Sequence, residues 1–387
     1  MHGAPNFVGM KIVHVVGARP NFMKVAPLMA AIERAGFAQQ LLVHTGQHYD
    51  ASMSDVFFDE LGLRKPDVFL GVGGGTPTEQ TAQAMLGFEK VLRDHRPDLV
   101  VVVGDVNSTI AAALAATQQH VRVAHVEAGL RSADMSMPEE VNRVLTDRIS
   151  DLLLTPSEDA NENLLREGLP RERIHLVGNI MIDTLLACLQ RAKASGTVAK
   201  LGLTPGRYAV VTMHRAANVD DRATLEQLVG TLDAVQQRLP VVFPIHPRTK
   251  KQLAAFGLEE RVAKMPNVKR VGPQGYLEMV DLTAHAQVVL TDSGGLQEET
   301  TALGVPCLTL RPETERPITV SEGTNTIVGT DRARTLAELD RVLAGKSKHG
   351  HCPALWDGRT SERIVAVFER EARSWQRPVD TGAPAQL

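Results

Sequence analysis

Short β-branched runs alternate with longer amphipathic segments along almost the whole chain. The runs have the length of strands, and the segments between them have helical periodicity. In the first half, strands are expected at 11–17, 39–46, 99–105, 121–129, 151–157 and 174–179. Helices are expected between them, for example at 22–35, 78–94 and 107–118. This alternation predicts a parallel sheet with helices on both faces.

The same pattern restarts in the second half. Further strands are expected at 208–214, 240–247, 268–272, 287–295 and 305–310, with a helix at 222–238. A length of 387 residues exceeds what one core usually serves. We therefore expect an α/β protein with two doubly wound domains facing each other across a cleft. The expected domains are 10–178 and 179–360, joined within 179–206, with a last helix at 361–375 packing back on the first.

Composition and charge narrow the classes of partner. A formal net charge of -3 predicts neither a nucleic-acid nor a membrane surface, and the apolar run at 99–103 is too short to span a bilayer. Cys188, Cys307 and Cys352 are far apart and read as reduced thiols, which favours the cytoplasm. Segment 1–9 lacks the features of a signal peptide, so we expect it and the tail at 377–387 to be disordered.

Candidate functional residues lie where strands end, because ligands of open α/β sheets bind beyond the carboxyl ends of the strands. The stretch "GARPNFMK" lacks a dinucleotide-binding glycine pattern, but it places Arg19 and Lys24 at a strand-to-helix turn. These cations can bind an anion or pair with a neighbouring loop. Asp105 ends a run of four valines, where it is either a helix N-cap or a functional carboxylate.

Two more carboxylates are expected at the same edge. Glu127 leaves the next strand, and Glu139 begins a helix, where the helix dipole alone would explain an acid. Convergence favours chemistry, because several carboxylates in a cleft raise one another's pKa. A carboxyl group with a raised pKa can act as acid or base near neutral pH.

The second half supplies histidines and a phosphate-binding turn. His214 and His246 each end a strand but lack metal-binding spacing, so we expect no metal site. His214 suits a phosphate oxygen or a proton transfer. In "TDSGGLQEE" (291–299), backbone N–H groups at a helix start can receive a phosphate. Glu299 would reach a ribose, while Glu298, about 100° away around the helix, is expected to be structural.

Together these features predict a nucleotide-diphosphate ligand and acid–base chemistry. Eight motifs then resemble, in order and over about residues 10–373, the non-hydrolysing UDP-N-acetylglucosamine 2-epimerases. They are "GARPNFMKVAPL", "GDVNST", "HVEAGLRS", "MPEEVNR", "VGN", "HR", "TDSGGLQEE" and "TERP". The resemblance implies a GT-B fold of two Rossmann-like domains, no cofactor, a homodimer and a role in polysaccharide biosynthesis.

The reaction implied is reversible epimerisation at carbon 2 of UDP-N-acetylglucosamine (UDP-GlcNAc) to UDP-N-acetylmannosamine (UDP-ManNAc). It proceeds by elimination of UDP to 2-acetamidoglucal and re-addition. Three alternatives stay open: the same chemistry on another UDP-acetamido sugar such as a diacetamido uronate, a hydrolysing variant that releases ManNAc, or a silent sugar-nucleotide-binding protein. Fold alone does not separate them.

The resemblance also assigns residues. Asp105, Glu127 and Glu139 match catalytic carboxylates, and His214 matches an important histidine. Substrate contacts are implied for Arg19, Lys24, Gln274, Ser293, Gly294, Gly295, Glu299 and Arg316. The chain departs from the family at Asn21, where Glu is common, and at Ala216 and Ala217, where a second Arg and a Glu are common. Tyr49 replaces an Arg of members that substrate activates, so such activation is not expected.

Overall fold

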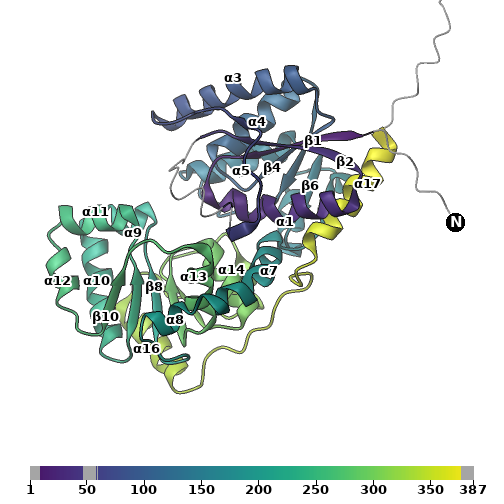
Figure 1. The fold of residues 1–387 in the computed structure, drawn as a ribbon. Coiled ribbons are helices and arrows are strands. Elements are labelled where there is room, and N and C mark those ends of the chain that lie inside the picture. The colour runs from purple at the N-terminus through teal and green to yellow at the C-terminus, as the bar shows by residue number, and fades with distance from the viewer. Residues whose placement is uncertain (1–8, 47–57, 59, 376–387) are drawn as a thin grey trace, which may run out of the picture.

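The computed structural model describes residues 9–46, 58 and 60–375 of the chain. Two parallel sheets, each covered by helices on both faces, follow one another along the sequence (Figure 1). The expected pair of doubly wound α/β units is thereby confirmed. The leader, the tail from residue 376 and Tyr49 lie outside the described residues.

The first sheet has the strand order β3-β2-β1-β4-β5-β6-β7. Its strands are β1 Met10–Val16, β2 Ala38–His44, β3 Val68–Phe69, β4 Leu99–Val103, β5 Arg122–Val126, β6 Leu152–Thr155 and β7 Ile174–Leu176. The central strand β4 is buried throughout, as its run of Leu and Val requires. The sequence pattern missed β3, because two residues show no periodicity.

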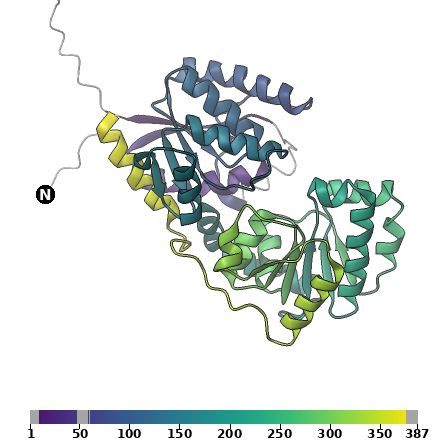
Figure 2. The ribbon, with the colours of Figure 1, turned by 180° about the vertical axis from the view of Figure 1, so that it is seen from behind.

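Helices cover both faces of this sheet. The helices α1 Arg19–Ala35, α7 Ile180–Ser195 and α17 Thr360–Trp375 contribute to one core, while α3 Pro77–His95 and α4 Asn107–Gln118 contribute to the other. Helix α17 lies along α1, so the end of the chain returns to the first sheet (Figure 2). Two further helices, α5 Pro138–Ile149 and α6 Glu158–Arg166, follow β5 and β6.

The second sheet has the order β10-β9-β8-β11-β12-β13. Its strands are β8 Ala209–Thr212, β9 Val241–Pro244, β10 Val268–Val271, β11 Val288–Thr291, β12 Cys307–Thr309 and β13 Asn325–Ile327. The last of these was not expected. One core involves α10 Arg222–Gln236, α11 Pro247–Ala255, α12 Glu259–Ala263 and α16 Arg332–Leu343, and the other α8 Thr197–Lys200 and α13 Tyr276–Ala284. The helices α9 Ala216–Val219, α14 Gly294–Leu303 and α15 Pro317–Ser321 follow β8, β11 and β12.

The stretch expected to join the two domains is mostly helical. Helix α7 begins after Asn179, whose side chain accepts a hydrogen bond from Met181 N at 3.0 Å. Ile182 and Leu185 of α7 belong to the core of the first sheet, and α7 also packs against α13 of the second half. Since α7 serves both halves, the division at 178/179 stays a prediction.

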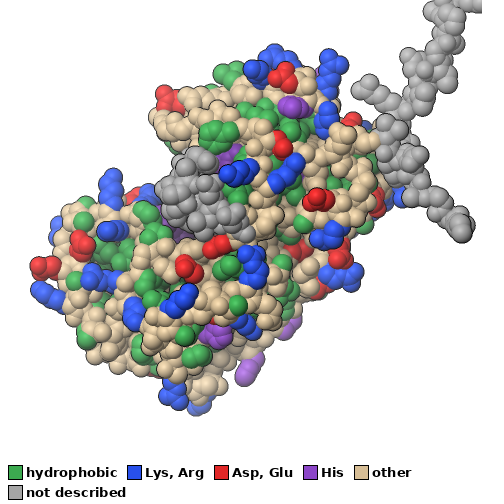
Figure 3. Space-filling view, viewed as in Figure 1, with side chains coloured by type: hydrophobic (Ala, Val, Ile, Leu, Met, Phe, Trp, Pro, Cys, Tyr) green, Lys and Arg blue, Asp and Glu red, His purple; other side chains and the backbone are tan. Residues whose placement is uncertain are grey.

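The surface carries mixed charge. Basic and acidic side chains are interspersed on the face shown in Figure 3. Within the described part of the chain, none of the helices combines the length and the apolar character that a membrane span requires.

Candidate active site

Glu127 follows β5 directly and has an unusual backbone conformation. Its φ of 73° lies in the left-handed region, which is uncommon for residues other than glycine. The amides of Glu127 and Ala128 both donate to the Leu154 carbonyl, at 3.0 and 3.1 Å. Backbone strain of this kind persists only where the surroundings hold it, and it often marks a functional site.

The carboxylate of Glu127 joins the two halves of the chain. It forms an ion pair with Lys24 of α1 on one side. On the other side its Oε1 lies 2.7 Å from Arg316 Nη2, which comes from the loop after β12. All three side chains are buried. Burial lowers the pKa of Lys24 to about 8, although the charge of Asp105 opposes this, so the ammonium keeps its proton at neutral pH.

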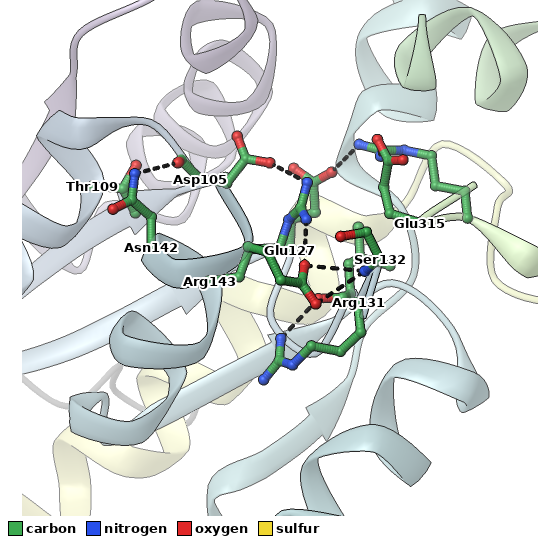
Figure 4. A network of polar contacts seen from close by, with 12 residues as sticks. Asp105, Thr109, Glu127, Arg131, Ser132, Asn142, Arg143 and Glu315 are labelled. Carbon is green, nitrogen blue, oxygen red and sulfur yellow. Dashed lines mark hydrogen bonds and ion pairs between the residues drawn. The ribbon is translucent and has the colours of Figure 1, made fainter. Parts of the chain in front are cut away.

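Asp105 follows β4 and is held by α5. Its Oδ2 accepts a hydrogen bond from Arg143 Nη2 at 2.6 Å, and its carbonyl accepts one from Asn142 Nδ2 at 2.9 Å (Figure 4). Burial alone would raise the pKa of Asp105, but Arg143, Lys24 and Arg316 outweigh it and hold the pKa below its usual range. No side-chain cap of α4 is formed, so Asp105 is not the helix cap that its position allowed.

Glu139, the third predicted carboxylate, stands at the start of α5. It is half-buried and forms no hydrogen bond or ion pair with the residues that the structure describes. Its neighbour Glu140 is buried instead, and pairs with Arg143 Nη1 at 2.7 Å. Of the three candidate carboxylates, Asp105 and Glu127 form ion pairs, and Glu139 forms none with the described residues.

A buried set of charges at the second half faces Glu127. Arg316 Nε lies 2.8 Å from Glu298 Oε1, and Arg316 Nη1 lies 2.7 Å from Glu315 Oε1. Burial alone would raise the pKa of Glu315, but Arg316, Arg311, Arg215 and Arg143 outweigh it and hold the pKa far below its usual range. Glu298, expected to be structural, therefore supports the arginine that meets Glu127.

His214 is oriented by a buried carboxylate. Its Nδ1 lies 2.9 Å from Asp292 Oδ1, and the amides of His214 and Arg215 donate to the same carboxylate at 2.8 and 2.9 Å. The ring is one-third exposed, at 33%, whereas Asp292 is fully buried. An Nδ1–H donated to Asp292 leaves Nε2 free to accept or deliver a proton.

The start of α14 has the predicted glycines, and the structure separates their roles. Ser293 precedes the helix, and its hydroxyl makes no capping bond. A Cβ added to Gly294 would lie 2.7 Å from Arg316 Nη1 and 2.8 Å from Glu315 Oε1, whereas one added to Gly295 would meet nothing within 4 Å. Gly294 thus lets the arginine loop pack against the helix, and Gly295 leaves the helix start open to a ligand.

This contrast gives a prediction. Gly294→Ala should displace the Arg316 guanidinium and lower kcat/KM about 100-fold, the scale expected when a site residue moves by about 1 Å. It should also lower the thermal stability. Gly295→Ala is the matched control and should unfold at the wild-type temperature. Identical melting curves and identical kinetics for the two variants would show that Gly294 has no such role.

Glu299 lies one turn further into α14, facing α13. It is buried, and burial raises its pKa to about 7, with the Tyr276 hydroxyl opposing the rise and the charge of Glu298 adding to it. Gln274 lies in the loop before α13, where its Nε2 donates to the Gly272 carbonyl at 2.9 Å. Both residues thus lie near the start of α13.

The departures from the family pattern are explained in part. Asn21 is buried, its Oδ1 accepts from Gly17 N and Ala18 N at 3.0 Å each, and its Nδ2 donates to Val103 O at 3.1 Å. A glutamate could accept the first two bonds but could not donate the third. Ala216 begins helix α9 without an acid in its first turn. Arg19 begins α1, so its backbone stands at the predicted turn.

Sequence reasoning missed three residues that organise this site: Arg143, Asp292 and Glu315. Each lies inside a quoted motif, "MPEEVNR", "TDSGG" or "TERP": Asp292 and Glu315 adjoin a selected residue, and Arg143 follows Glu139 by four positions. Their charge in a strand-end motif was the available signal. Among the described residues, no group of three or more His, Cys, Asp or Glu side chains is placed to hold a metal ion.

Comparison with known proteins adds an independent line. A family model described as UDP-N-acetylglucosamine 2-epimerase matches residues 30–369. The UDP-N-acetylglucosamine 2-epimerase of Methanocaldococcus jannaschii is 41% identical over 364 residues, which cover 93% of this chain and 99% of the relative. The UDP-2,3-diacetamido-2,3-dideoxy-D-glucuronate 2-epimerase of Pseudomonas aeruginosa is 42% identical over 365 residues, covering 93% and 100%.

Comparison with solved structures identifies the same family. A crystal structure of M. jannaschii UDP-GlcNAc 2-epimerase, in complex with UDP-GlcNAc and UDP, matches with a TM-score of 0.87 and 41% identity, covering 93% of this chain and 100% of that one. A lipopolysaccharide outer core galactosyltransferase, 14% identical with a TM-score of 0.51, shares the fold alone. The expected GT-B fold is confirmed.

Proposed function

The chain belongs to the UDP-N-acetylglucosamine 2-epimerase family, and we propose that it interconverts UDP-GlcNAc and UDP-ManNAc. One observation carries the proposal. Glu127, at the edge of the first sheet, meets Arg316 of the second half, beside the open helix start of α14. This contact brings a carboxylate cluster for acid–base chemistry next to a site for a diphosphate.

The chemistry explains why both parts are needed. The hydrogen on carbon 2 of the sugar is not next to a carbonyl group, so it is barely acidic. It becomes removable as the anomeric C–O bond breaks and positive charge develops beside it. The N–H groups at the start of α14 and the cation of Arg316 stabilise the departing UDP, and a carboxylate near carbon 2 accepts the proton.

We infer different roles for the three carboxylates from their surroundings. Asp105 and Glu127 are both ion-paired, which favours their charged forms, and we assign to them the stabilisation of the developing positive charge of the sugar. Glu139 forms no hydrogen bond or ion pair with the residues that the structure describes, so its carboxylate is available to a substrate atom. We assign it to proton exchange at carbon 2. Nε2 of His214, oriented by Asp292, is the second proton-transfer group, because re-addition delivers a proton to the opposite face.

Glu299 gives a pH-dependent prediction. A carboxylate accepts both hydroxyls of a ribose diol only when it is ionised, and the pKa of Glu299 is about 7. Protonation therefore competes with the nucleotide, and the Kd for UDP should rise about tenfold for each pH unit below about 7. Calorimetric titration with UDP between about pH 5 and pH 8, a range that includes the pKa of Glu299, measures how the Kd changes with pH. In Glu299→Gln the Kd for UDP should be higher than in the wild type above about pH 7, and it should not change with pH in this window.

The same pKa shift has a consequence for stability. The folded state binds this proton more tightly than the unfolded state, whose ordinary value is 4.5. The stability of the wild type should therefore fall as pH rises from 4.5 to about 7. Glu299→Gln removes this penalty and should be the more stable protein at pH 8, roughly one unit above the folded pKa.

In the UDP titration, a wild-type affinity that does not change with pH would exclude Glu299 as the ribose contact.

A second candidate substrate is a diacetamido uronate linked to UDP. One observation favours it: the Nε of Arg215 is buried without a hydrogen-bond partner in the described structure, and its Nη2 lies 3.5 Å from Glu315. A sugar carboxylate could take up this donor, but so could a phosphate oxygen. The relative from P. aeruginosa is named for such a sugar.

Comparing both nucleotides tests the choice. We expect a higher kcat/KM with UDP-GlcNAc than with UDP-2,3-diacetamido-2,3-dideoxy-glucuronate. Turnover of the uronate without turnover of UDP-GlcNAc would reverse the assignment.

We further propose that the protein is a homodimer that supplies polysaccharide biosynthesis, in line with the family resemblance. We place it in the cytoplasm, in line with the free thiols of Cys188, Cys307 and Cys352.

A further inference from the structure

A histidine–aspartate pair lies directly behind the candidate carboxylates and is inaccessible to solvent. His125 Nδ1 lies 2.6 Å from Asp147 Oδ1, and both side chains are fully buried. His125 Nε2 lies 2.8 Å from the carbonyl oxygen of Gly104. Since Gly104 precedes Asp105, the pair connects the end of β4 with helix α5 through a residue of β5.

Asp147 extends this connection on its other side. Its Oδ2 accepts hydrogen bonds from Gly129 N at 3.0 Å and lies 2.8 Å from Arg131 Nη1. Gly129 belongs to the turn that follows Glu127. The pair therefore touches three segments: the turn of Asp105, the turn of Glu127 and the helix that Glu139 begins.

These turns have backbone conformations that are unusual for the ends of strands. Gly104, Glu127 and Gly129 all have φ in the left-handed region, at 67°, 73° and 83°. Such turns keep their shape only when other contacts hold them. The amides of Gly104, Glu127 and Ala128 bond to strand carbonyls, and the bonds to Gly104 O and Gly129 N add one contact from each member of the pair.

The partners of His125 also fix where its protons are. A backbone carbonyl can only accept, so the Nε2 facing Gly104 must carry a proton. Asp147 lies against the Arg131 guanidinium, and the effect of burial on its pKa is outweighed by His125 and Arg131, which hold the pKa below its usual range. The carboxylate is therefore ionised, and its Oδ1 is an acceptor. The Nδ1 facing it must then also carry a proton. A neutral imidazole has only one N–H and could satisfy only one of the two acceptors.

We propose that His125 is a doubly protonated, positively charged positioning residue that, with Asp147, holds the segments carrying Asp105, Glu127 and Glu139 in place. The catalytic part of this inference rests on the proposed function; the charge state does not. Burial alone would raise the pKa of Asp147, but His125 and Arg131 outweigh it and hold the pKa below its usual range.

A second histidine provides a matched control. His14 is also fully buried, in β1 of the same sheet, but its ring contacts the side chain of Gln40, and its Nδ1 has no partner. Burial lowers the pKa of His14 to about 4, so this ring is neutral. Among the described residues, His14 forms no hydrogen bond with the three segments that carry the carboxylates.

Neutron diffraction on crystals of the deuterated wild-type protein tests the charge state directly. We expect a deuteron on both ring nitrogens of His125 and on only one nitrogen of His14. A single deuteron on His125 would overturn the proposal. This measurement needs neither a folded variant nor enzymatic activity, so it decides the charge state even if the protein proves inactive on UDP-GlcNAc.

Kinetics of His125→Asn and His125→Gln test the positioning role. The Asn amide can replace the donor to Asp147, and the Gln amide the donor to Gly104, so each variant keeps one bond. We expect kcat to fall about 100-fold in both, the scale expected for misplaced catalytic groups. The Kd for UDP should stay unchanged, because α14 is untouched, and His14→Gln should keep the wild-type kcat. Wild-type kcat in both His125 variants, or an equal loss in His14→Gln, would overturn the positioning role.

Discussion

Replacing Asp105 by asparagine is expected to lower kcat by about 10²–10⁴-fold, the range that acid–base and charge-stabilising groups contribute. The side chain keeps its shape, and Arg143 keeps its buried partner Glu140, so the protein should stay folded. What disappears is the negative charge beside the sugar. Initial rates with UDP-GlcNAc, together with circular dichroism, measure both parts of this prediction.

The control lies at the other end of the same strand. Asp98 precedes β4, and its Oδ2 accepts a hydrogen bond from Lys11 N at 2.8 Å. Asp98→Asn changes the same kind of side chain at the opposite edge of the sheet, where no ligand is expected. It should keep the wild-type kcat. If both variants kept it, Asp105 would have no part in the reaction.

Replacing Arg316 by methionine is expected to have the second largest effect. Its guanidinium contacts the three buried carboxylates of Glu127, Glu298 and Glu315. Glu127 would keep Lys24 and Glu315 would keep Arg311, but Glu298 would lose its ion pair. Leaving a buried charge uncompensated costs about 3–5 kcal/mol. Urea unfolding should show this loss, and activity should be undetectable in the same assay.

A double variant separates stability from function. Glu298→Gln in the Arg316→Met background removes the uncompensated charge, so it should recover much of the lost stability. It should not recover UDP binding or turnover, because the cation that meets both the diphosphate site and Glu127 is still absent. Equal stability of the single and the double variant would contradict the role assigned to Glu298.

Sequence patterns predicted the parts of this site that depend on local order. Strand–helix alternation gave the two sheets, and parallel strands place their carboxyl ends at one edge, so Asp105 and Glu127 were expected together. Strand β3 was missed because two residues cannot show a period, and β13, whose three residues begin with a buried Asn, was missed as well.

The charge pairings could not be predicted in the same way. Helical periodicity separated Glu298 from Glu299 but did not indicate what each would face. The partner of Glu298 is Arg316, which comes from a loop after another strand. Likewise, Arg143 reaches Asp105 from a different helix, 38 residues away in sequence. Such contacts depend on how loops from both sheets converge, and that is decided by tertiary packing.

The left-handed conformation of Glu127 is a further feature of this kind. Nothing in "HVEAG" requires a positive φ at the glutamate, since the neighbouring Gly129 could have supplied the whole turn. The chain instead turns at Glu127, where the amides of Glu127 and Ala128 donate to the Leu154 carbonyl. Asp147, which pairs with His125, also accepts a hydrogen bond from Gly129 N in this turn.

Incubation of the pure protein with UDP-GlcNAc in heavy water, followed by NMR at carbon 2 of the sugar, tests the central claim most directly. Proton exchange at carbon 2 is the step for which the carboxylates, His214 and the diphosphate site are all needed. The account predicts UDP-ManNAc that carries deuterium at carbon 2, and deuterium also entering the remaining UDP-GlcNAc. Free ManNAc and UDP would identify a hydrolysing enzyme instead. UDP-GlcNAc that keeps its hydrogen at carbon 2, with no UDP-ManNAc formed, would contradict the account.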